Sequence, residues 1–112
     1  MGPDTPFDVL VTGTNGTMTA RLVGELDLVT VPTFVQRLDS LHEEGARQLT
    51  LDLTDLAFID STGLSALVSA LKRYRASGGD IVLRSPSRAT TKVLEISGLA
   101  QVFTVESENS GP

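Results

Sequence analysis

The sequence contains no cysteine and no tryptophan, and only one histidine, one tyrosine and four phenylalanines occur among its 112 residues. Without cysteine the chain can form no disulfide, no thiol nucleophile and no thiolate metal site. With so few aromatic residues, its core must be built mainly from leucine, valine, isoleucine and alanine. With His42 as its single histidine, the chain has few side chains that could bind a metal ion or act in acid–base catalysis. We therefore expect no metal site, no cofactor and no catalytic turnover.

Long apolar runs and an excess of positive charge are also missing. No run approaches the ~18 residues of a membrane-spanning helix, and the N-terminus lacks the charged and then apolar pattern of a signal peptide. The formal net charge of −5 disfavours nucleic acid or an anionic membrane as a partner. Two local groups of basic residues, at 72–75 and 84–92, are interpreted as solvated helix faces in preference to a phosphate-binding patch. These absences predict a cytoplasmic protein that binds neither nucleic acid nor membrane.

The length fits one domain over residues 1–112, because two independent cores would need a longer chain. We expect the core of this domain at about residues 7–105. The segments 1–6 and 106–112 are poor in apolar residues, so they are predicted to be flexible tails. No internal repeat and no linker divides the sequence.

The main structural and functional signals lie between Leu49 and Leu64. Leucines at every second position from Leu49 to Leu53 alternate with polar residues, which is typical of a strand with one buried face. From Leu64 to Tyr74 the apolar residues instead follow the i, i+3, i+4, i+7 spacing of an amphipathic helix. Four residues lie where the chain leaves the buried strand and enters the helix: Asp60, Ser61, Thr62 and Gly63.

The flanking segments predict further strands and helices. Two alternating runs around Asn15-Gly16 predict a β-hairpin. A helix is predicted to begin at Thr30, its N-cap, with a buried stripe of Val31, Phe34, Val35, Leu38 and Leu41. The run 81–83 predicts a covered strand. A third helix, which starts near Ser87 and ends at Gly98, is predicted to turn Ala89, Val93 and Ile96 inward, and 99–105 to be strand-like.

The predicted order is strand, strand, helix, strand, helix, strand, helix, strand. Each strand–helix–strand unit implies a parallel pair joined by a right-handed crossover, whereas the first hairpin is antiparallel. The sequence therefore predicts an α/β domain with a mixed sheet of four or five strands and an N-terminal β-hairpin.

Residues 60–63, at the start of the helix, allow three interpretations. In the first, Ser61 or Thr62 only caps the helix, and Gly63 allows a close approach of two backbones. In the second, Ser61 is a hydrolase nucleophile; we reject it because the Gly-x-Ser-x-Gly pattern is incomplete and His42 is not placed as its base. In the third, Ser61 is a phosphoacceptor, with Thr62 as the second choice, because a helix N-terminus tolerates an anion.

Two carboxylates flank Leu26 at a predicted strand end, in the run Gly24-Glu25-Leu26-Asp27. A catalytic pair or a cation site is disfavoured, because nothing else in the chain supplies a metal shell or a histidine partner. Acids at an exposed strand end carry little folding energy. Glu25 and Asp27 are therefore expected to contribute more to partner binding than to stability.

Three motifs in order resemble the STAS domain of bacterial anti-sigma factor antagonists. They are residues 24–27, the run 53–64, and Ser97-Gly98-Leu99, and the resemblance extends from about Phe7 to Val105. It implies a STAS fold, with helices packed mainly on one face of the mixed sheet. After Val105 only seven polar residues remain, so a C-terminal helix found in many relatives is expected to be short or missing.

The resemblance also implies a binding protein and not an enzyme. Its unphosphorylated form would bind an anti-sigma factor that is also a serine kinase, and so release a sigma factor. The kinase would then phosphorylate Ser61 and dissociate, and a partner serine phosphatase would reverse the modification. The implied partner surface consists of Gly24, Glu25, Leu26, Asp27, Asp60, Ser61, Thr62 and Gly63.

An alternative from another functional class is a STAS adaptor subunit of a stress-signalling scaffold or of a lipid-transport complex. In such an assembly the domain would have no sigma pathway of its own. The intact acceptor serine and the acidic, free-standing chain favour the antagonist.

Overall fold

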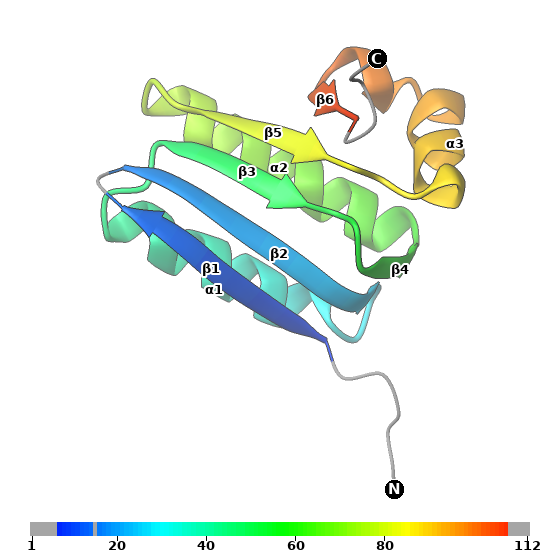
Figure 1. Ribbon diagram of the computed structural model, residues 1–112, viewed down its shortest axis with the longest axis horizontal. Coiled ribbons are helices and arrows are strands. Elements are labelled where there is room, and N and C mark those ends of the chain that lie inside the picture. The colour runs from blue at the N-terminus through cyan, green and yellow to red at the C-terminus, as the bar shows by residue number, and fades with distance from the viewer. Residues whose placement is uncertain (1–6, 15, 108–112) are drawn as a thin grey trace, which may run out of the picture.

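A computed structural model describes residues 7–14 and 16–107 of the chain (Figure 1). Strands and helices alternate largely as the sequence predicts. In chain order the elements are β1 (Asp8–Thr14), β2 (Thr17–Leu26), α1 (Val31–Glu43), β3 (Gln48–Asp52), β4 (Leu56–Ile59), α2 (Ser61–Ala76), β5 (Asp80–Arg84), α3 (Arg88–Ile96), the 3-10 helix η1 (Leu99–Gln101) and β6 (Thr104–Glu106).

The strands form one mixed sheet in the order β1-β2-β3-β5-β6, and β4 pairs with β2 outside this path. The β1–β2 hairpin is antiparallel, whereas the β2–β3, β2–β4, β3–β5 and β5–β6 pairs are parallel. The predicted α/β class, the N-terminal hairpin and the mixed sheet are thereby confirmed. The sheet has six strands instead of four or five, because the short strand β4 was not predicted.

The helices α1 and α2 pack side by side on one face of the sheet (Figure 1). Between them and the sheet lies an aliphatic core, as the composition predicts. Its largest fully buried side chains are Tyr74, Phe34, Leu22, Leu26, Leu38, Leu49, Leu51, Leu53, Leu56, Leu67, Leu71 and Ile81. Tyr74 donates a hydrogen bond from its hydroxyl to the Leu38 carbonyl at 2.9 Å, so the one buried phenol is satisfied. Burial, with the nearby charge of Asp39, raises the pKa of Tyr74 to about 12.

Two predicted helix faces need correction. In α1 the side chains of Phe34, Leu38 and Leu41 are buried, but Val35 is exposed on the flank of the helix. In α3 the inward residues are Thr90 and Leu94. The predicted inward residues behave differently: Ala89 and Ile96 are exposed, and Val93 is half-buried. The cause is the position of α3, which lies at the end of the sheet against η1 and β4 and does not lie over the strands.

The C-terminal part of the chain also differs from the prediction. The segment expected to be one strand over 99–105 is divided into η1 and β6. Glu106, placed in a tail by the sequence, is the last residue of β6. The other predicted tail residues, 1–6 and 108–112, lie outside the described part of the chain. In that described part, no helix is long and apolar enough to cross a membrane.

Candidate functional site

Two of the three sequence motifs, residues 24–27 and the end of the run 53–64, meet at one edge of the sheet. β2 and β4 pair in parallel with Leu26 opposite Ile59, so both strands end at the same edge. The Asp60 amide donates to the Leu26 carbonyl at 3.2 Å and continues this contact past the end of β4. The segments Gly24–Asp27 and Asp60–Gly63 are therefore neighbours in space. Their role in partner binding stays a prediction.

Asp60 is the N-cap of α2. Its backbone is extended, with φ −106° and ψ −174°, and its carboxylate oxygen Oδ1 accepts the Gly63 amide at 2.8 Å. The prediction that Ser61 or Thr62 caps this helix is therefore wrong. An aspartate caps as well as a serine and better than a threonine, and here it occupies the position before the first helical residue.

Ser61 is the first residue of α2, and its side chain is exposed. Within residues 7–14 and 16–107 its hydroxyl has no hydrogen-bond partner. Thr62 is half-buried beside it. The hydroxyl of Ser61 is thus accessible to another protein, and no capping bond would have to break for it to react.

Gly63 holds the first turn of α2 close to the strand ends. A Cβ added at this buried position would lie 2.5 Å from the Leu26 carbonyl oxygen and 2.8 Å from Cγ1 of Ile59. Real side chains do not approach this closely, so any larger residue would push α2 away from β2 and β4. The expectation that Gly63 permits a close approach of two backbones agrees with this geometry.

Asp27 organises the loop between β2 and α1. Its Oδ1 accepts the amides of Val29 at 3.0 Å and Thr30 at 3.1 Å. Thr30 stands at the N-cap position but makes no capping bond with its own side chain. Instead, its hydroxyl donates to the Glu25 carbonyl at 2.7 Å and accepts the Asp27 amide at 3.0 Å. Asp27 therefore has a structural role in this loop, whereas the Glu25 side chain is exposed. That both acids contribute more to partner binding than to stability stays a prediction.

Exposed apolar residues adjoin this loop. Leu28 is 71% exposed and Val29 is 82% exposed, and both lie between Asp27 and Thr30. Phe58 on β4 is half-exposed and pairs in register with Glu25. These three residues were not predicted as surface residues, because they belong to no alternating or helical stripe. The signal for Leu28 and Val29 was their place in a short loop, whereas Phe58 lies on the short strand β4.

A groove of about 460 Å³ begins at Ser61 and follows α2 toward the α3–η1 connection. It is mostly apolar, and serine hydroxyls are among the groups that line it. Its lining residues are Ser61, Leu64, Ser65, Val68, Ser69, Ser97 and Leu99. The groove explains why Leu64 and Val68, which the helical spacing placed in the core, are only half-buried. It also puts Ser97 and Leu99, from the third motif of the sequence, on the same surface as Ser61.

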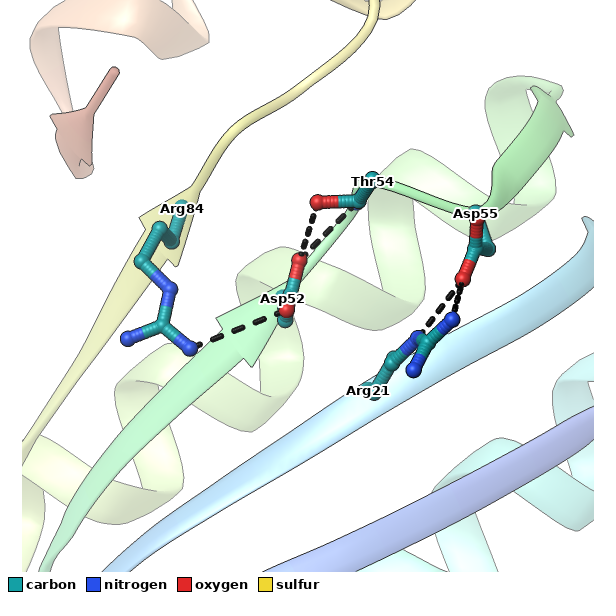
Figure 2. A network of polar contacts seen from close by, with 5 residues as sticks. All are labelled: Arg21, Asp52, Thr54, Asp55 and Arg84. Atoms are coloured by element: carbon teal, nitrogen blue, oxygen red, sulfur yellow. Dashed lines mark hydrogen bonds and ion pairs between the residues drawn. The ribbon is translucent and has the colours of Figure 1, made fainter. Parts of the chain in front are cut away.

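The turn between β3 and β4 is held by Asp52 (Figure 2). Its Oδ1 accepts the amide of Thr54 at 3.0 Å and the hydroxyl of Thr54 at 2.6 Å, and its Oδ2 lies 3.6 Å from Nη2 of Arg84. Burial alone would raise the pKa of Asp52. The hydrogen bonds from Thr54 and the charges of Arg84 and Arg21 outweigh burial and hold this pKa below its ordinary value.

The same turn is fastened to β2 at two points. The Arg21 guanidinium donates through Nε and Nη2 to one carboxylate oxygen of Asp55 (Figure 2). The Asp55 carbonyl accepts the amide of Gly24 at 3.2 Å. Gly24 has a φ of +103° next to an irregularity in the β2–β4 register, and this conformation favours glycine. These contacts fix where β4 starts on β2 and hence where Asp60 lies.

His42 is remote from Ser61. Its Nε2 lies 2.7 Å from Oγ of Ser77, the C-cap of α2, and its ring packs edge-on against Tyr74. Ser61 begins the same helix, so about 24 Å of helix separates the two groups at 1.5 Å per residue. This placement agrees with the rejection of a serine nucleophile. No group of three or more metal-binding side chains occurs in the described residues.

Sequence comparisons identify related proteins over nearly the whole chain. A family model described as the STAS domain matches residues 8–110. The anti-sigma-B factor antagonist of Bacillus subtilis (strain 168) is 30% identical over 91 residues, which cover 81% of this chain and 83% of that protein. The anti-sigma-B factor antagonist of Listeria monocytogenes is 32% identical over 93 residues, which cover 80% of this chain and 82% of that protein.

Solved structures with the same fold include two anti-sigma factor antagonists. The unphosphorylated form of SpoIIAA superposes with a TM-score of 0.77 at 25% identity, over 93% of this chain and 90% of that chain. An antagonist from Mycobacterium paratuberculosis gives a TM-score of 0.82 at 22% identity, over 95% and 90% of the two chains. The second likeness, at its lower identity, shows the fold alone.

Proposed function

Since the chain belongs to the STAS domain family, we propose that it is an anti-sigma factor antagonist whose binding is switched by phosphorylation of Ser61. The Bacillus subtilis and Listeria monocytogenes relatives described above carry that name, and the chain spans more than four fifths of the length of each. Anti-sigma factor antagonists are regulators and not enzymes. Under this proposal the unphosphorylated chain binds an anti-sigma factor serine kinase in the cytoplasm and thereby releases a sigma factor.

One observation carries the proposal: Ser61 is exposed and lies where the segments 24–27 and 60–63 meet, and its hydroxyl has no hydrogen-bond partner among the described residues. A kinase can reach this hydroxyl without unfolding the chain. The start of α2 is stabilised by the neighbours of Ser61 and not by Ser61 itself. Asp60 caps the helix, and Gly63 allows it to pack closely against β2. Modification of Ser61 would therefore change the surface and leave the fold intact.

The proposed partner surface is larger than the two motifs. From the segments 24–27 and 60–63 it includes the accessible residues Glu25, Asp27, Asp60, Ser61 and Thr62, whereas Gly24, Leu26 and Gly63 are buried beneath it. The exposed loop residues Leu28 and Val29 and the groove that begins at Ser61 extend it. Burying a valine or leucine side chain fully is worth about 1.5–3 kcal/mol. Leu28 and Val29 can therefore supply much of the affinity, while the acids and Ser61 supply specificity and control.

The charge of a phosphate is large enough to act as the switch. A phosphoserine adds about −1.5 to −2 charges at neutral pH. At roughly 6 Å from one acidic group of a partner, with an effective dielectric constant near 20, the repulsion is about 4–5 kcal/mol before screening. A loss of about 2.7 kcal/mol already lowers affinity about 100-fold. The Asp60 carboxylate already holds the Gly63 amide, so the phosphate cannot take this capping bond without displacing it.

The test begins with baits that differ only at position 61. Ser61→Ala should fold, capture the kinase from an extract of the source bacterium, and keep it when ATP is added. Ser61→Asp should fold and capture less of it, although one carboxylate carries less charge than a phosphate. The captured kinase is then incubated with wild-type protein and ATP, and peptide mass spectrometry locates the phosphate.

The outcomes separate the alternatives. Phosphate on Ser61, removed by a serine phosphatase, supports the proposal. Phosphate on Thr62 and not on Ser61 would move the acceptor by one residue. Capture of scaffold or transporter components, with phosphate on neither residue, would instead favour a STAS adaptor.

A further inference from the structure

One face of the sheet carries no helix. α1 and α2 both lie behind the sheet in Figure 1, and no described helix lies over β1, β2, β3 and β5 on the side toward the viewer. Antiparallel sheets often have one face in water, but sheets of parallel strands are ordinarily covered on both faces. Here β2, β3, β5 and β6 form a parallel set with one uncovered face. This face is a candidate contact surface.

The open face displays a row of alternating charges. The register places four side chains opposite one another across four neighbouring strands: Arg21, Asp52, Arg84 and Glu106. Their neighbours Leu22, Leu51 and Leu83 point into the core, so the charged residues point to the open side. The adjacent row on this face is uncharged and consists of Thr19, Thr50, Val82 and Thr104.

We propose that this face binds a second copy of the chain, about a two-fold axis that runs parallel to the strands between β3 and β5. Such an axis places β3 over β5 of the second copy and β2 over its β6. Asp52 then faces Arg84 of the other copy, and Arg21 faces its Glu106. All four charges meet an opposite charge, Arg21 in addition to its ion pair with Asp55 of the same chain. Every contact occurs twice, as a closed two-fold interface requires.

Other two-fold arrangements of the same faces are less favourable. An axis along β3 sets Asp52 against Asp52, and an axis along β5 sets Arg84 against Arg84. An axis perpendicular to the strands, along this row, places each residue opposite the same residue of the second copy, so that like charges face each other. An axis between β2 and β3 pairs Arg21 with Asp52 but leaves Arg84 against Leu10. Because like charges in contact cost several kcal/mol, the row selects the axis between β3 and β5.

The ion pairs of the single chain are compatible with this contact. Asp52 and Arg84 already lie 3.6 Å apart (Figure 2), so the two copies would form a ring of four alternating charges around the axis. The Asp52 side chain is only 18% exposed before association, so little further water has to be removed from it. Glu106 has no ion pair within the described residues and would gain one.

The size of the overlap predicts a weak dimer. Four strands about 4.8 Å apart and five residues of about 3.3 Å rise give a footprint of roughly 300 Å² per copy. The sum of roughly 600 Å² is below the ~1,200–2,000 Å² of stable, specific interfaces. We therefore expect reversible association that is visible only at high protein concentration.

The geometry has a consequence for the candidate functional site. An axis parallel to the strands leaves strand direction unchanged, so the edges at which β2 and β4 end would face the same way in both copies. The two Ser61 sites would lie at one end of the dimer, and the helices would lie on its outer faces. A partner with two binding sites could then bind both copies with increased avidity. The dimer itself does not depend on the proposed function.

Sedimentation equilibrium of the full chain tests the proposal. At low salt, between about 10 µM and about 1 mM, the average mass should rise toward twice that of the monomer, as expected for a small interface. Arg84→Glu should weaken association at least ~10-fold, because it sets like charges together. The exchange D52R/R84D should restore association, since the two-fold axis pairs the same positions. Glu106→Lys, on an exposed strand end, is a second disrupting variant that leaves the core untouched.

A matched control is Arg73→Glu. It makes the same change of charge and breaks an ion pair, with Asp39 at 3.1 Å, but on the helical face. It should leave association unchanged, and circular dichroism should show that every variant is folded. A protein that stays monomeric at ~1 mM, a dimer insensitive to Arg84→Glu and Glu106→Lys, or one equally weakened by Arg73→Glu would overturn the proposal.

Discussion

The cap formed by Asp60 allows stability and charge to be separated at the candidate site. Asp60→Ala removes the acceptor of the Gly63 amide, and the loss of an N-cap costs about 1 kcal/mol. For a domain of this length, that loss lowers Tm by about 4 °C. Asp60→Asn keeps an acceptor oxygen at the same place and loses only the interaction of charge with the helix dipole, about 0.3–1 kcal/mol. We expect stability in the order wild type, Asp60→Asn, Asp60→Ala.

Urea denaturation and amide hydrogen exchange measure this order. In Asp60→Ala the Gly63 amide should exchange faster than in wild type, while amides in the middle of α2 should change little. Glu95→Ala is the matched control, because it removes one exposed acid from α3 whose side chain makes no hydrogen bond within residues 7–14 and 16–107. If Asp60→Ala were as stable as wild type, with an unchanged Gly63 amide, the assignment of Asp60 as the cap would be refuted.

The contacts of Asp27, Gly63 and Asp52 predict three further effects on stability. Asp27→Ala should lower the free energy of unfolding by about 1 kcal/mol in urea denaturation, since Asp27 accepts two amides at the start of α1, and Asp27→Asn should lose less. Gly63→Ala should cost about 1–3 kcal/mol in the same assay, because its methyl group meets the Leu26 carbonyl. The Asp52 pKa is lowered by folding, so its stabilisation is present above an ordinary aspartate pKa of about 3.9 and is lost as pH falls through the lower folded value. Urea titrations of wild type and Asp52→Asn should therefore converge at low pH; a gap that stays constant would contradict this.

Regular patterns were predicted well from the sequence. The alternating runs on both sides of Asn15-Gly16 form β1 and β2, and the alternating leucines from Leu49 form β3. β4 was missed because it has only four residues and buries its two ends while exposing its middle, so it shows no alternation. The predicted face of α3 was wrong because a helix at the end of a sheet buries only the residues that its few neighbours cover, and Ile96 is 78% exposed.

The site was only partly predictable, because capping depends on geometry. The sequence placed the junction of strand and helix at residues 60–63, but the cap was expected at Ser61 or Thr62 and lies at Asp60. Only the extended backbone at Asp60 decides which residue forms the cap. The same applies to Asp27, whose bonds depend on how the loop folds back toward Val29 and Thr30. The exposure of Leu28 and Val29 could be seen only in the structure, because residue type alone does not determine whether a side chain is buried.

The division of tasks around Ser61 explains how one residue can be free to change its charge. The cap is formed by the residue before it, and the close packing of α2 on β2 is made two residues after it. The register of the preceding strand is fixed farther back, where Arg21 and Gly24 hold the turn at Asp55. A hydroxyl that served as the cap would have to give up about 1 kcal/mol of stability when modified. Ser61 has no such bond, so nearly all of the electrostatic effect of a phosphate would act on the partner and not on the fold.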